Sequence, residues 1–380
     1  MRVNYSLPKE KIMAFQKEPA YTHGKTGKTA VLLVNLGSPD APTPAAVRRY
    51  LKEFLWDPRV VEVPRPLWWL ILHGIILPFR SRASAKKYAS VWTKDGSPLK
   101  VHTEKQAILL QGYLGERGHE VVVRHAMRYG EPALASVLTQ LKQEGCERIL
   151  VLPAYPQYSA TTTASVQDAI SQHYLTIRNL PELRFIKHYH DHPGYIEALK
   201  QSVLAYWQKN GRGDKLLMSF HGLPKAFLLR GDPYHCECYK TARLLAQALG
   251  LQEHQYAVSF QSRLGKAEWL QPYTSDSVKK LAKEGVAKLD VICPGFIADC
   301  LETLEEIAME VRAEFLAHGG KEFQYIPCLN QDNVWLRSLA EIAEQHLIGW
   351  PTMLTPGQRD LQKQQALQSR SLAKRLGAEH

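Results

Sequence analysis

Short apolar runs alternate with amphipathic helical patterns along most of the chain, and this alternation constrains the fold more than any other feature. Apolar runs without polar interruption are typical of parallel strands, because the helices that connect such strands cover both faces of the sheet. The pattern predicts strands at 29–37, 120–127, 148–155, 215–220, 256–262 and 289–296. We therefore expect an α/β fold built from parallel sheets flanked by helices.

Three stretches of the first half resemble three stretches of the second half, in the same order. The pairs are VNLGSP (34–39) with SFHGLP (219–224), AMRYG (126–130) with QSRLG (261–265), and EGCERILVLPAY (144–155) with EGVAKLDVICPGF (284–296). Each match alone is weak, since strand–turn sequences resemble one another, but the shared order indicates one design used twice. We predict two similar Rossmann-like domains, each a parallel sheet flanked by helices, with a cleft between them.

The spacing of these matches indicates where the two halves differ. The first pair lies 185 residues apart and the second 135, so the first half carries 50 extra residues between its first two strands. We expect this insertion, within 40–120, to form a lip beside the cleft. The predicted divisions are an N-terminal arm (1–28), a first domain (29–154 plus 330–350), a second domain (155–329) and a polar C-terminal tail (351–380).

The most apolar part of the insertion, Leu67 to Leu77, is too short to span a bilayer. Two interpretations remain open. It is either a buried helix or the tip of a lip that dips into a membrane interface. In the second case Trp68 and Trp69 would anchor it, with Arg80 and Arg82 on its flank.

The formal net charge of +11 is spread over the N-terminal arm, residues 80–105 and the tail. Because the chain has no nucleic-acid motif, we expect no nucleic-acid partner. The charge suits anionic small molecules, an anionic membrane surface or simply a basic solvated exterior. The first residues lack the apolar segment of a secretion signal, and the six cysteines include no C-x-x-C, so we expect a cytoplasmic protein with free thiols.

Ligands of doubly wound sheets bind outside the carboxyl ends of the strands, and His221 stands at one such end, before a Gly-x-Pro turn. Its ring is either a structural core residue or a catalytic group. By the internal repeat, Leu36 occupies the equivalent place on the opposite wall. A later helix carries carboxylates at four-residue spacing from Glu302 to Glu314, preceded by Asp299. They form either a solvated acidic face or a path that passes a divalent cation to the cleft, toward His221.

The segments LLVNLGSP, RYGEPAL, LPAYPQYSATTT, SFHGLP, GDPY and PGFIADCLETLEEI together resemble the ferrochelatases, most closely the bacterial members, from about Val31 to Trp350. The resemblance implies chelatase-type domains and insertion of ferrous iron into protoporphyrin IX, which gives protoheme at the end of heme biosynthesis. Fe²⁺ is then a substrate, and no tightly bound cofactor is expected. The alternatives are a chelatase for coproporphyrin III or cobalt, and a non-catalytic porphyrin- or metal-binding protein.

The resemblance also implies roles for particular residues. Those implied as catalytic are His221 and Glu302, and those implied as metal ligands are His221, Glu302 and Glu306. Together with the cleft argument, it indicates these substrate-binding residues: Leu36, Arg80, Arg128, Tyr129, Tyr155, Trp269, Phe296 and Asp299. It implies a protein in the cytoplasm or peripheral on the inner face of the cell membrane.

The chain departs from the family pattern at two places. Cys300 stands where many relatives have a histidine, so a second histidine ligand is absent. Ala160 stands where the animal members have a cysteine for an iron–sulfur cluster, and no cysteine follows Cys328, so no [2Fe–2S] cluster of the animal type is expected. Cys236 and Cys238 are either structural or ligands of a soft metal.

Overall fold

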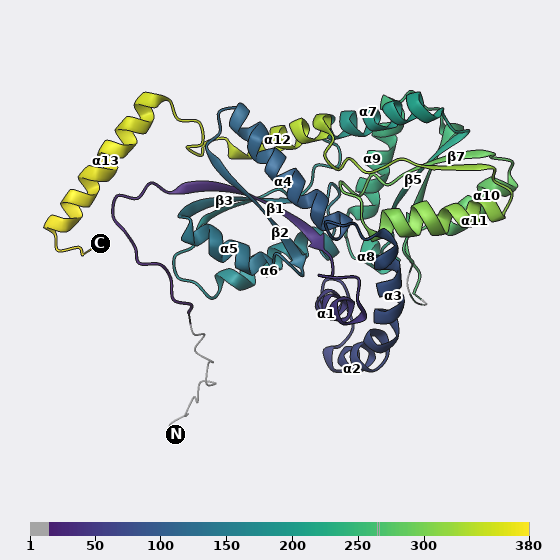
Figure 1. Cartoon of the computed structure of the whole chain (residues 1–380), viewed down its shortest axis with the longest axis horizontal. Coiled ribbons are helices and arrows are strands. Elements are labelled where there is room, and N and C mark those ends of the chain that lie inside the picture. The colour runs from purple at the N-terminus through teal and green to yellow at the C-terminus, as the bar shows by residue number, and fades with distance from the viewer. Residues whose placement is uncertain (1–14, 264, 266, 380) are drawn as a thin grey trace, which may run out of the picture.

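The computed structural model describes residues 15–263, 265 and 267–379. The first 14 residues of the predicted N-terminal arm, and with them the region examined for a secretion signal, lie outside the described residues. The described chain contains two four-stranded sheets, and every strand pair in both is parallel. Helices flank both sheets (Figure 1). The predicted α/β fold is confirmed.

The two sheets have the same topology. The first has the order β2-β1-β3-β4 and the second has the order β6-β5-β7-β8. The strands are β1 (Lys28–Gly37), β2 (Val121–Tyr129), β3 (Cys146–Pro153), β4 (Glu182–Phe185), β5 (Lys215–His221), β6 (Tyr256–Gln261), β7 (Lys288–Ile292) and β8 (Glu322–Tyr325). The matching order confirms the duplication predicted from the three paired segments.

The helices follow the alternation expected from the sequence. They are α1 (Pro44–Leu55), α2 (Arg65–Ile71), α3 (Leu77–Val91), α4 (Pro98–Glu116), α5 (Leu134–Gln143), α6 (Ser165–Tyr174), α7 (Pro193–Asn210), α8 (Lys225–Leu229), α9 (Tyr234–Ala248), α10 (Thr274–Lys283), α11 (Arg312–Ala317), α12 (Asn333–Leu347) and α13 (Pro356–Arg375). Three segments are π-helices, η1 (Leu72–Ile76), η2 (Ala160–Ala164) and η4 (Glu302–Val311), and η3 (Glu253–Gln255) is a 3₁₀ turn.

All six predicted strands are present, and the prediction missed only the edge strands β4 and β8. Each of these has four residues, too few for a periodic signal. β4 pairs with β3 in the first sheet, so the first sheet extends beyond the boundary expected at residue 155. The crossover to the second sheet is instead made by α7, which begins at Pro193.

One apolar core joins the two halves. It contains Leu33 of β1, Phe220 of β5, Tyr195 of α7 and Trp335 of α12, all of them fully or almost fully buried. α12 packs against α4 of the first half and α7 of the crossover. The C-terminal part of the chain therefore packs against both α4 and the crossover helix.

The 50-residue insertion forms a projecting lip made of α1, α2, η1 and α3 (Figure 1). Trp68 is buried in it, and its indole N–H donates to the carbonyl oxygen of Leu55 (2.7 Å). The interpretation of Trp68 as a membrane anchor is therefore wrong; it fastens α2 to α1. Trp69, by contrast, is 51% exposed. Along the described residues, no helix combines the length and apolar character that crossing a bilayer requires.

The polar tail forms the helix α13, which extends from one end of the molecule (Figure 1). A capping box of Thr355 and Gln358 begins it, and none of its residues is buried. Gly24 of the N-terminal arm lies against this helix, where a Cβ atom would meet the Ala366 carbonyl oxygen at 2.4 Å. The tail therefore contacts the arm.

Candidate active site

His221 is the last residue of β5, paired in register with Gln261 of β6. Its Nδ1 lies 2.6 Å from the carbonyl oxygen of the next residue, Gly222. A carbonyl can only accept a hydrogen bond, so Nδ1 carries the proton and the neutral ring keeps its lone pair on Nε2. The turn thus fixes the tautomer and leaves one nitrogen able to accept a proton or bind a metal.

The Gly-x-Pro turn after His221 has no room for a larger residue. A Cβ atom on Gly222 would lie 2.6 Å from the Gln261 carbonyl oxygen and 3.2 Å from the Trp269 ring. The Gly222 N–H donates to that same Gln261 oxygen at 2.7 Å. Glycine is therefore required by close approach, and the turn brings the Trp269 indole beside His221.

The π-helix η4 provides the carboxylates. Both oxygens of Glu306 are bonded to Ser262, Oε1 to its N–H (2.6 Å) and Oε2 to its hydroxyl (2.5 Å). Ser262 has a φ of 65°, a left-handed conformation that a non-glycine residue rarely adopts. The two bonds to Glu306 offset this strain and hold the loop after β6 against η4. π-Helices are rare and often occur at functional sites.

His221, Glu302 and Glu306 lie close enough for their charges to interact. Burial raises the pKa of Glu306, and the negative charge of Glu302 raises it further. The Ser262 hydrogen bonds and a positive charge on His221 oppose that rise. A protonated His221 would therefore be stabilised by an ionised Glu306.

Two tyrosines of the lip cover Glu302. Burial raises the pKa of Tyr50 on α1 and of Tyr88 on α3, and the charge of Glu302 raises both further. The Cys300 thiol also faces Glu302, and its pKa is raised by burial and by this carboxylate. Sequence reasoning missed Tyr50 and Tyr88, since they lie in the insertion, about 210–250 residues from the carboxylate along the chain. The one signal that could have placed Tyr50 on an inward face is the amphipathic pattern of α1.

The remaining carboxylates of η4 and α11 form ion pairs with lysines. Glu310 and Glu305 both accept from Lys87 of the lip, at 2.7 and 3.0 Å. Glu314 lies 3.4 Å from Lys279. The expected row of carboxylates is therefore divided. Glu306 lies near both His221 and Glu302, whereas Glu310 fastens the lip to η4.

Asp299 is almost fully buried just before η4. Its Oδ1 accepts from the Tyr325 hydroxyl (2.5 Å) and the Thr303 hydroxyl (3.0 Å), and its Oδ2 accepts from Asn330 Nδ2 (2.6 Å). These bonds occupy both oxygens. The structure therefore brings Asp299 to the start of η4, where its contacts hold that helix and β8 together.

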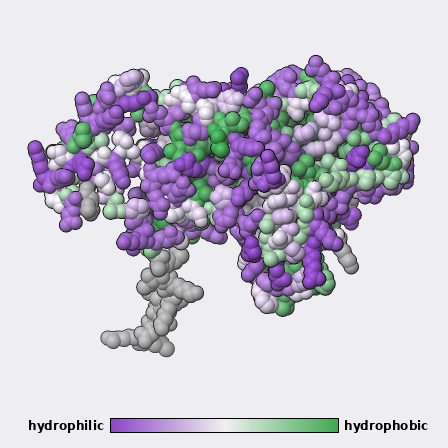
Figure 2. Space-filling view, in the orientation of Figure 1, coloured by the Kyte–Doolittle hydropathy of each residue, from purple (hydrophilic) through white to green (hydrophobic). Residues whose placement is uncertain are grey.

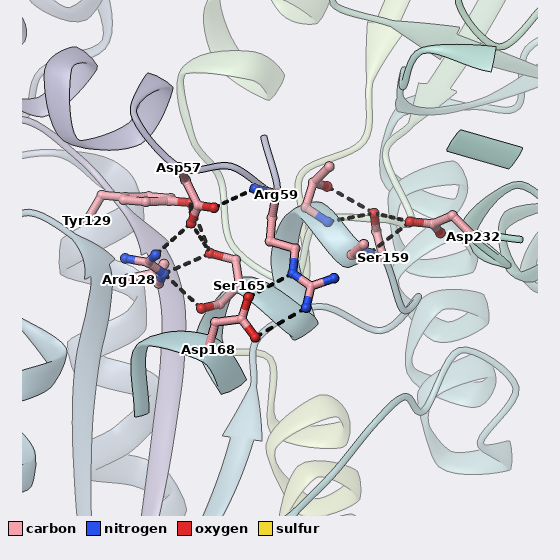
Figure 3. Close-up of polar contacts among 10 residues, drawn as sticks. Asp57, Arg59, Arg128, Tyr129, Ser159, Ser165, Asp168 and Asp232 are labelled. Atoms are coloured by element: carbon pink, nitrogen blue, oxygen red, sulfur yellow. Dashed lines mark hydrogen bonds and ion pairs between the residues drawn. The ribbon is translucent and has the colours of Figure 1, made fainter. Parts of the chain in front are cut away.

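Arg128 and Tyr129 lie at the end of β2 and both bond to one buried carboxylate, Asp57 (Figure 3). The Arg128 guanidinium is 2.5 Å and the Tyr129 hydroxyl 2.8 Å from Asp57 Oδ2. Ser165 donates to the same oxygen at 2.5 Å. Asp57 follows α1, so this network attaches the base of the lip to the first sheet.

The other expected substrate residues divide into a central and an outer group. Leu36 and Phe296, from opposite halves, pack into one apolar cluster with Cys300. The Tyr155 hydroxyl and the Trp269 indole N–H are buried, and neither has a hydrogen-bond partner among the described residues. Arg80 lies on the exposed side of α3. The cleft between the halves remains a prediction.

A family model described as Ferrochelatase matches residues 28–347. The chain is 68% identical to the ferrochelatase of Janthinobacterium sp. (strain Marseille) over 97% of its length and 100% of that protein. It is 65% identical to the ferrochelatase of Herminiimonas arsenicoxydans over the same shares. The chain belongs to the ferrochelatase family.

Among solved structures, SirB from Bacillus subtilis with Fe³⁺ has a TM-score of 0.48 and 12% identity, over 86% of this chain and 100% of that chain.

Membership of the ferrochelatase family agrees with the resemblance found in the sequence motifs. The roles of the individual residues stay predictions. Of these residues, the structure gathers His221, Glu302, Glu306 and Trp269 at the carboxyl ends of β5 and β6, and it places Arg80 on the outer surface.

Proposed function

We propose that this ferrochelatase inserts ferrous iron into protoporphyrin IX at the junction of β5, β6 and η4, and so forms protoheme. The observation that supports this site best is geometric: His221 ends β5, and Glu306, one turn after Glu302 on η4, is held by Ser262 just after β6. The porphyrin and Fe²⁺ are the two substrates. The reaction replaces two pyrrole N–H protons by one iron ion, so the site has to accept protons as well as a dication.

His221 is the proton acceptor in this proposal. Its Nδ1–H is held by the Gly222 carbonyl, so an incoming pyrrole proton binds at Nε2. The imidazolium that forms faces Glu306, whose carboxylate Ser262 holds in place. General bases of this kind typically contribute about 10²- to 10⁴-fold to a rate.

Glu302 is the iron-contacting carboxylate in this proposal. Unlike Glu306, it is not held by Ser262, and it lies under Tyr50 and Tyr88. Carboxylate and imidazole ligands together suit Fe²⁺. A covered carboxylate can replace water around the ion as it moves toward the porphyrin nitrogens.

The macrocycle is flat and largely apolar, and we assign its contacts to the aromatic and apolar groups around this site. Tyr155 and Trp269 each present a buried polar atom without a partner, which a bound porphyrin or water could satisfy. Leu36 and Phe296 come from opposite halves and pack against one apolar cluster, and we assign both to contacts with the ring.

The test is metalloporphyrin formation followed by absorbance, with protoporphyrin IX and either Fe²⁺ or Zn²⁺. His221→Ala is expected to lower the rate by about 10²-fold or more. His318→Ala, which removes an exposed imidazole on α11's C-terminal side, is the control and is expected to keep the wild-type rate. Full activity in His221→Ala would overturn the site, and turnover of coproporphyrin III but not protoporphyrin IX would overturn the substrate.

The lip is also proposed to touch the inner face of the cell membrane without crossing it. Its exposed large apolar side chains are Leu67, Trp69, Leu70, Ile75 and Phe79, each more than half exposed. Figure 2 shows hydrophobic residues at the end of this projection, between hydrophilic ones. Exposed apolar groups next to the basic residues Arg80 and Arg82 suit an anionic bilayer surface.

Vesicles made of a zwitterionic lipid with a minor anionic lipid test this contact. Wild-type protein is expected to sediment with them, and a Trp69→Ser/Phe79→Ser double variant is expected to stay in the supernatant. Both residues are exposed, so the variant should fold normally. Equal sedimentation of the two proteins would refute the contact.

A further inference from the structure

Two histidines and a glutamate lie together outside the reaction centre. His188 and His190 belong to the segment between β4 and α7, and Glu237 belongs to the first turn of α9. The nitrogen and oxygen atoms that they offer all lie within 4.8 Å of one another. None of the three residues belongs to the lip, the predicted porphyrin contacts or the proposed site of iron insertion.

The local backbone explains why both imidazoles point to α9. Successive side chains of an extended segment point to opposite sides. Tyr189, between the histidines, points into the core, where it stacks on Trp335 and its hydroxyl donates to the Pro153 carbonyl oxygen (3.2 Å). His188 and His190 therefore both point away from that core, toward Glu237.

Glu237 is 7% exposed, and both its oxygens have neighbours. Oε1 lies 2.7 Å from His188 Nδ1. Oε2 lies 3.2 Å from His190 Nδ1 and accepts from the Tyr158 N–H at 2.7 Å. A carboxylate this deeply buried needs compensating positive charge or hydrogen bonds.

His190 provides the second, independent observation. Its side chain is 6% exposed, and its Nδ1 forms no hydrogen bond among the described residues although Glu237 Oε2 is only 3.2 Å away. A buried ring nitrogen without a partner is uncommon. The ring nitrogen and the carboxylate oxygen thus lie close together without a hydrogen bond, an arrangement that a cation bound by both atoms would stabilise.

We propose that His188, His190 and Glu237 bind one divalent transition-metal ion. Two imidazole nitrogens and a carboxylate oxygen suit borderline ions such as Zn²⁺, Co²⁺ or Fe²⁺, and they do not suit Ca²⁺ or Mg²⁺. Ligand bonds of about 2.0–2.2 Å are reached from the present geometry by small side-chain rotations. The His188 side chain is 40% exposed, so an ion enters from solvent, and a water molecule can complete the coordination.

The ion would have a structural role, because its ligands connect α9 to the first half of the chain. Glu237 already binds the loop after β3 through Tyr158, and Thr241, one turn later on α9, donates to the His190 carbonyl oxygen (2.8 Å). Tyr155, a predicted porphyrin contact, lies in the same loop. The ion itself takes no part in iron insertion in this proposal; its effect is to stabilise the loop that carries Tyr155.

Zinc binding to the full-length, metal-free protein tests the proposal. Bound Zn²⁺ is measured by equilibrium dialysis, with thermal unfolding as a second measurement. Wild-type protein is expected to bind one equivalent more than His188→Ala and Glu237→Gln, and Zn²⁺ should raise its melting temperature more. Losing a ligand should weaken this site by at least the roughly 10- to 100-fold that loss of a residue merely supporting a ligand costs.

His318→Ala is the control, because it also removes an exposed imidazole and should bind Zn²⁺ like wild type. Crystals soaked in Zn²⁺ should give an anomalous difference peak between His188, His190 and Glu237. Unchanged stoichiometry and affinity in His188→Ala, or no peak at these residues, would overturn the proposal. His188→Ala alone is decisive if Glu237→Gln fails to fold, since its half-exposed ring can be removed without leaving a cavity.

Discussion

Replacing Asp57 by alanine is expected to lower the free energy of unfolding by about 3–5 kcal/mol, the usual cost of breaking a buried, hydrogen-bonded ion pair. Asp57 is 5% exposed and binds Arg128, Tyr129, Ser165 and the N–H of Arg59 (Figure 3). Without its carboxylate the Arg128 guanidinium, only 18% exposed, loses its anionic partner. The base of the lip also loses its attachment to β2.

The change in melting temperature that this loss of free energy causes follows from the length of the chain. Unfolding entropy of about 2.1 cal/mol/K per residue, for 380 residues, gives about 0.8 kcal/mol per kelvin at the midpoint. A loss of about 3–5 kcal/mol therefore lowers the melting temperature by about 4–6 °C. Differential scanning calorimetry at neutral pH measures this shift directly, provided that the scans are reversible.

Asp168→Ala is the matched control, because Asp168 pairs with Arg59 in the same region of the molecule (Figure 3). The two side chains of that pair are 44% and 41% exposed, so the pair contributes about 0–1 kcal/mol. Its loss should move the melting temperature by about 1 °C or less. The reasoning would be refuted by an Asp57→Ala protein that melts within about 1 °C of the Asp168→Ala protein.

The pH dependence gives a further check on Asp57. Burial raises its pKa, but the hydrogen bonds from Ser165, the Arg59 N–H and Tyr129, with the charge of Arg128, lower it below the ordinary value of 3.8. A carboxyl whose pKa is lowered by folding stabilises the folded state above its unfolded pKa and loses that contribution as the pH falls through the folded one. The difference between wild type and Asp57→Ala should therefore be complete at pH 7 and shrink only below pH 3.8.

Two further predictions concern the reaction centre. Glu306→Gln should slow metalloporphyrin formation at neutral pH, because the imidazolium of His221 loses its ionised partner. Burial raises the pKa of Glu306 above the ordinary 4.5, so the wild-type rate should fall as the pH drops through that raised value. The rate–pH profile of the glutamine variant should lack this acidic fall in rate. Gly222→Ala should lower kcat by about 10²-fold, the effect of a displacement near 1 Å, because its Cβ would collide with the Gln261 carbonyl oxygen and press on Trp269. A Gly222→Ala enzyme with wild-type kcat would contradict the close approach.

The sequence pointed to His221, Glu302 and Glu306 because they lie on periodic elements, and their roles stay predictions. His221 ends an apolar strand, and Glu302 and Glu306 lie one turn apart on a helix that begins near a strand's carboxyl end. The strand and helix patterns were enough to place all three residues at the carboxyl ends of the strands of the second sheet. The π-helical form of η4 was not predictable from the spacing, since four-residue repeats share one face of an α-helix as well.

The groups that complete the site were not predictable, because they come from segments distant in sequence. Tyr50 and Tyr88 reach Glu302 from the lip, and Asp57 reaches Arg128 across 71 residues. His188, His190 and Glu237 come together only through the packing of α9 against the segment after β4. Single polar residues in loops carry no periodic signal, so their partners are decided by how the chain returns on itself.

The sequence by itself therefore determined the fold class, the duplication, the family and the residues on strand ends, since hydrophobic periodicity and local turn chemistry encode all of these. Only the tertiary structure decided how these pieces are joined. It placed β4 in the first sheet, buried Trp68, divided the acidic row between His221 and Lys87, and brought His188 and His190 to Glu237. The physical reason is that long-range packing and buried charge pairing depend on contacts between distant segments, which a local pattern does not specify.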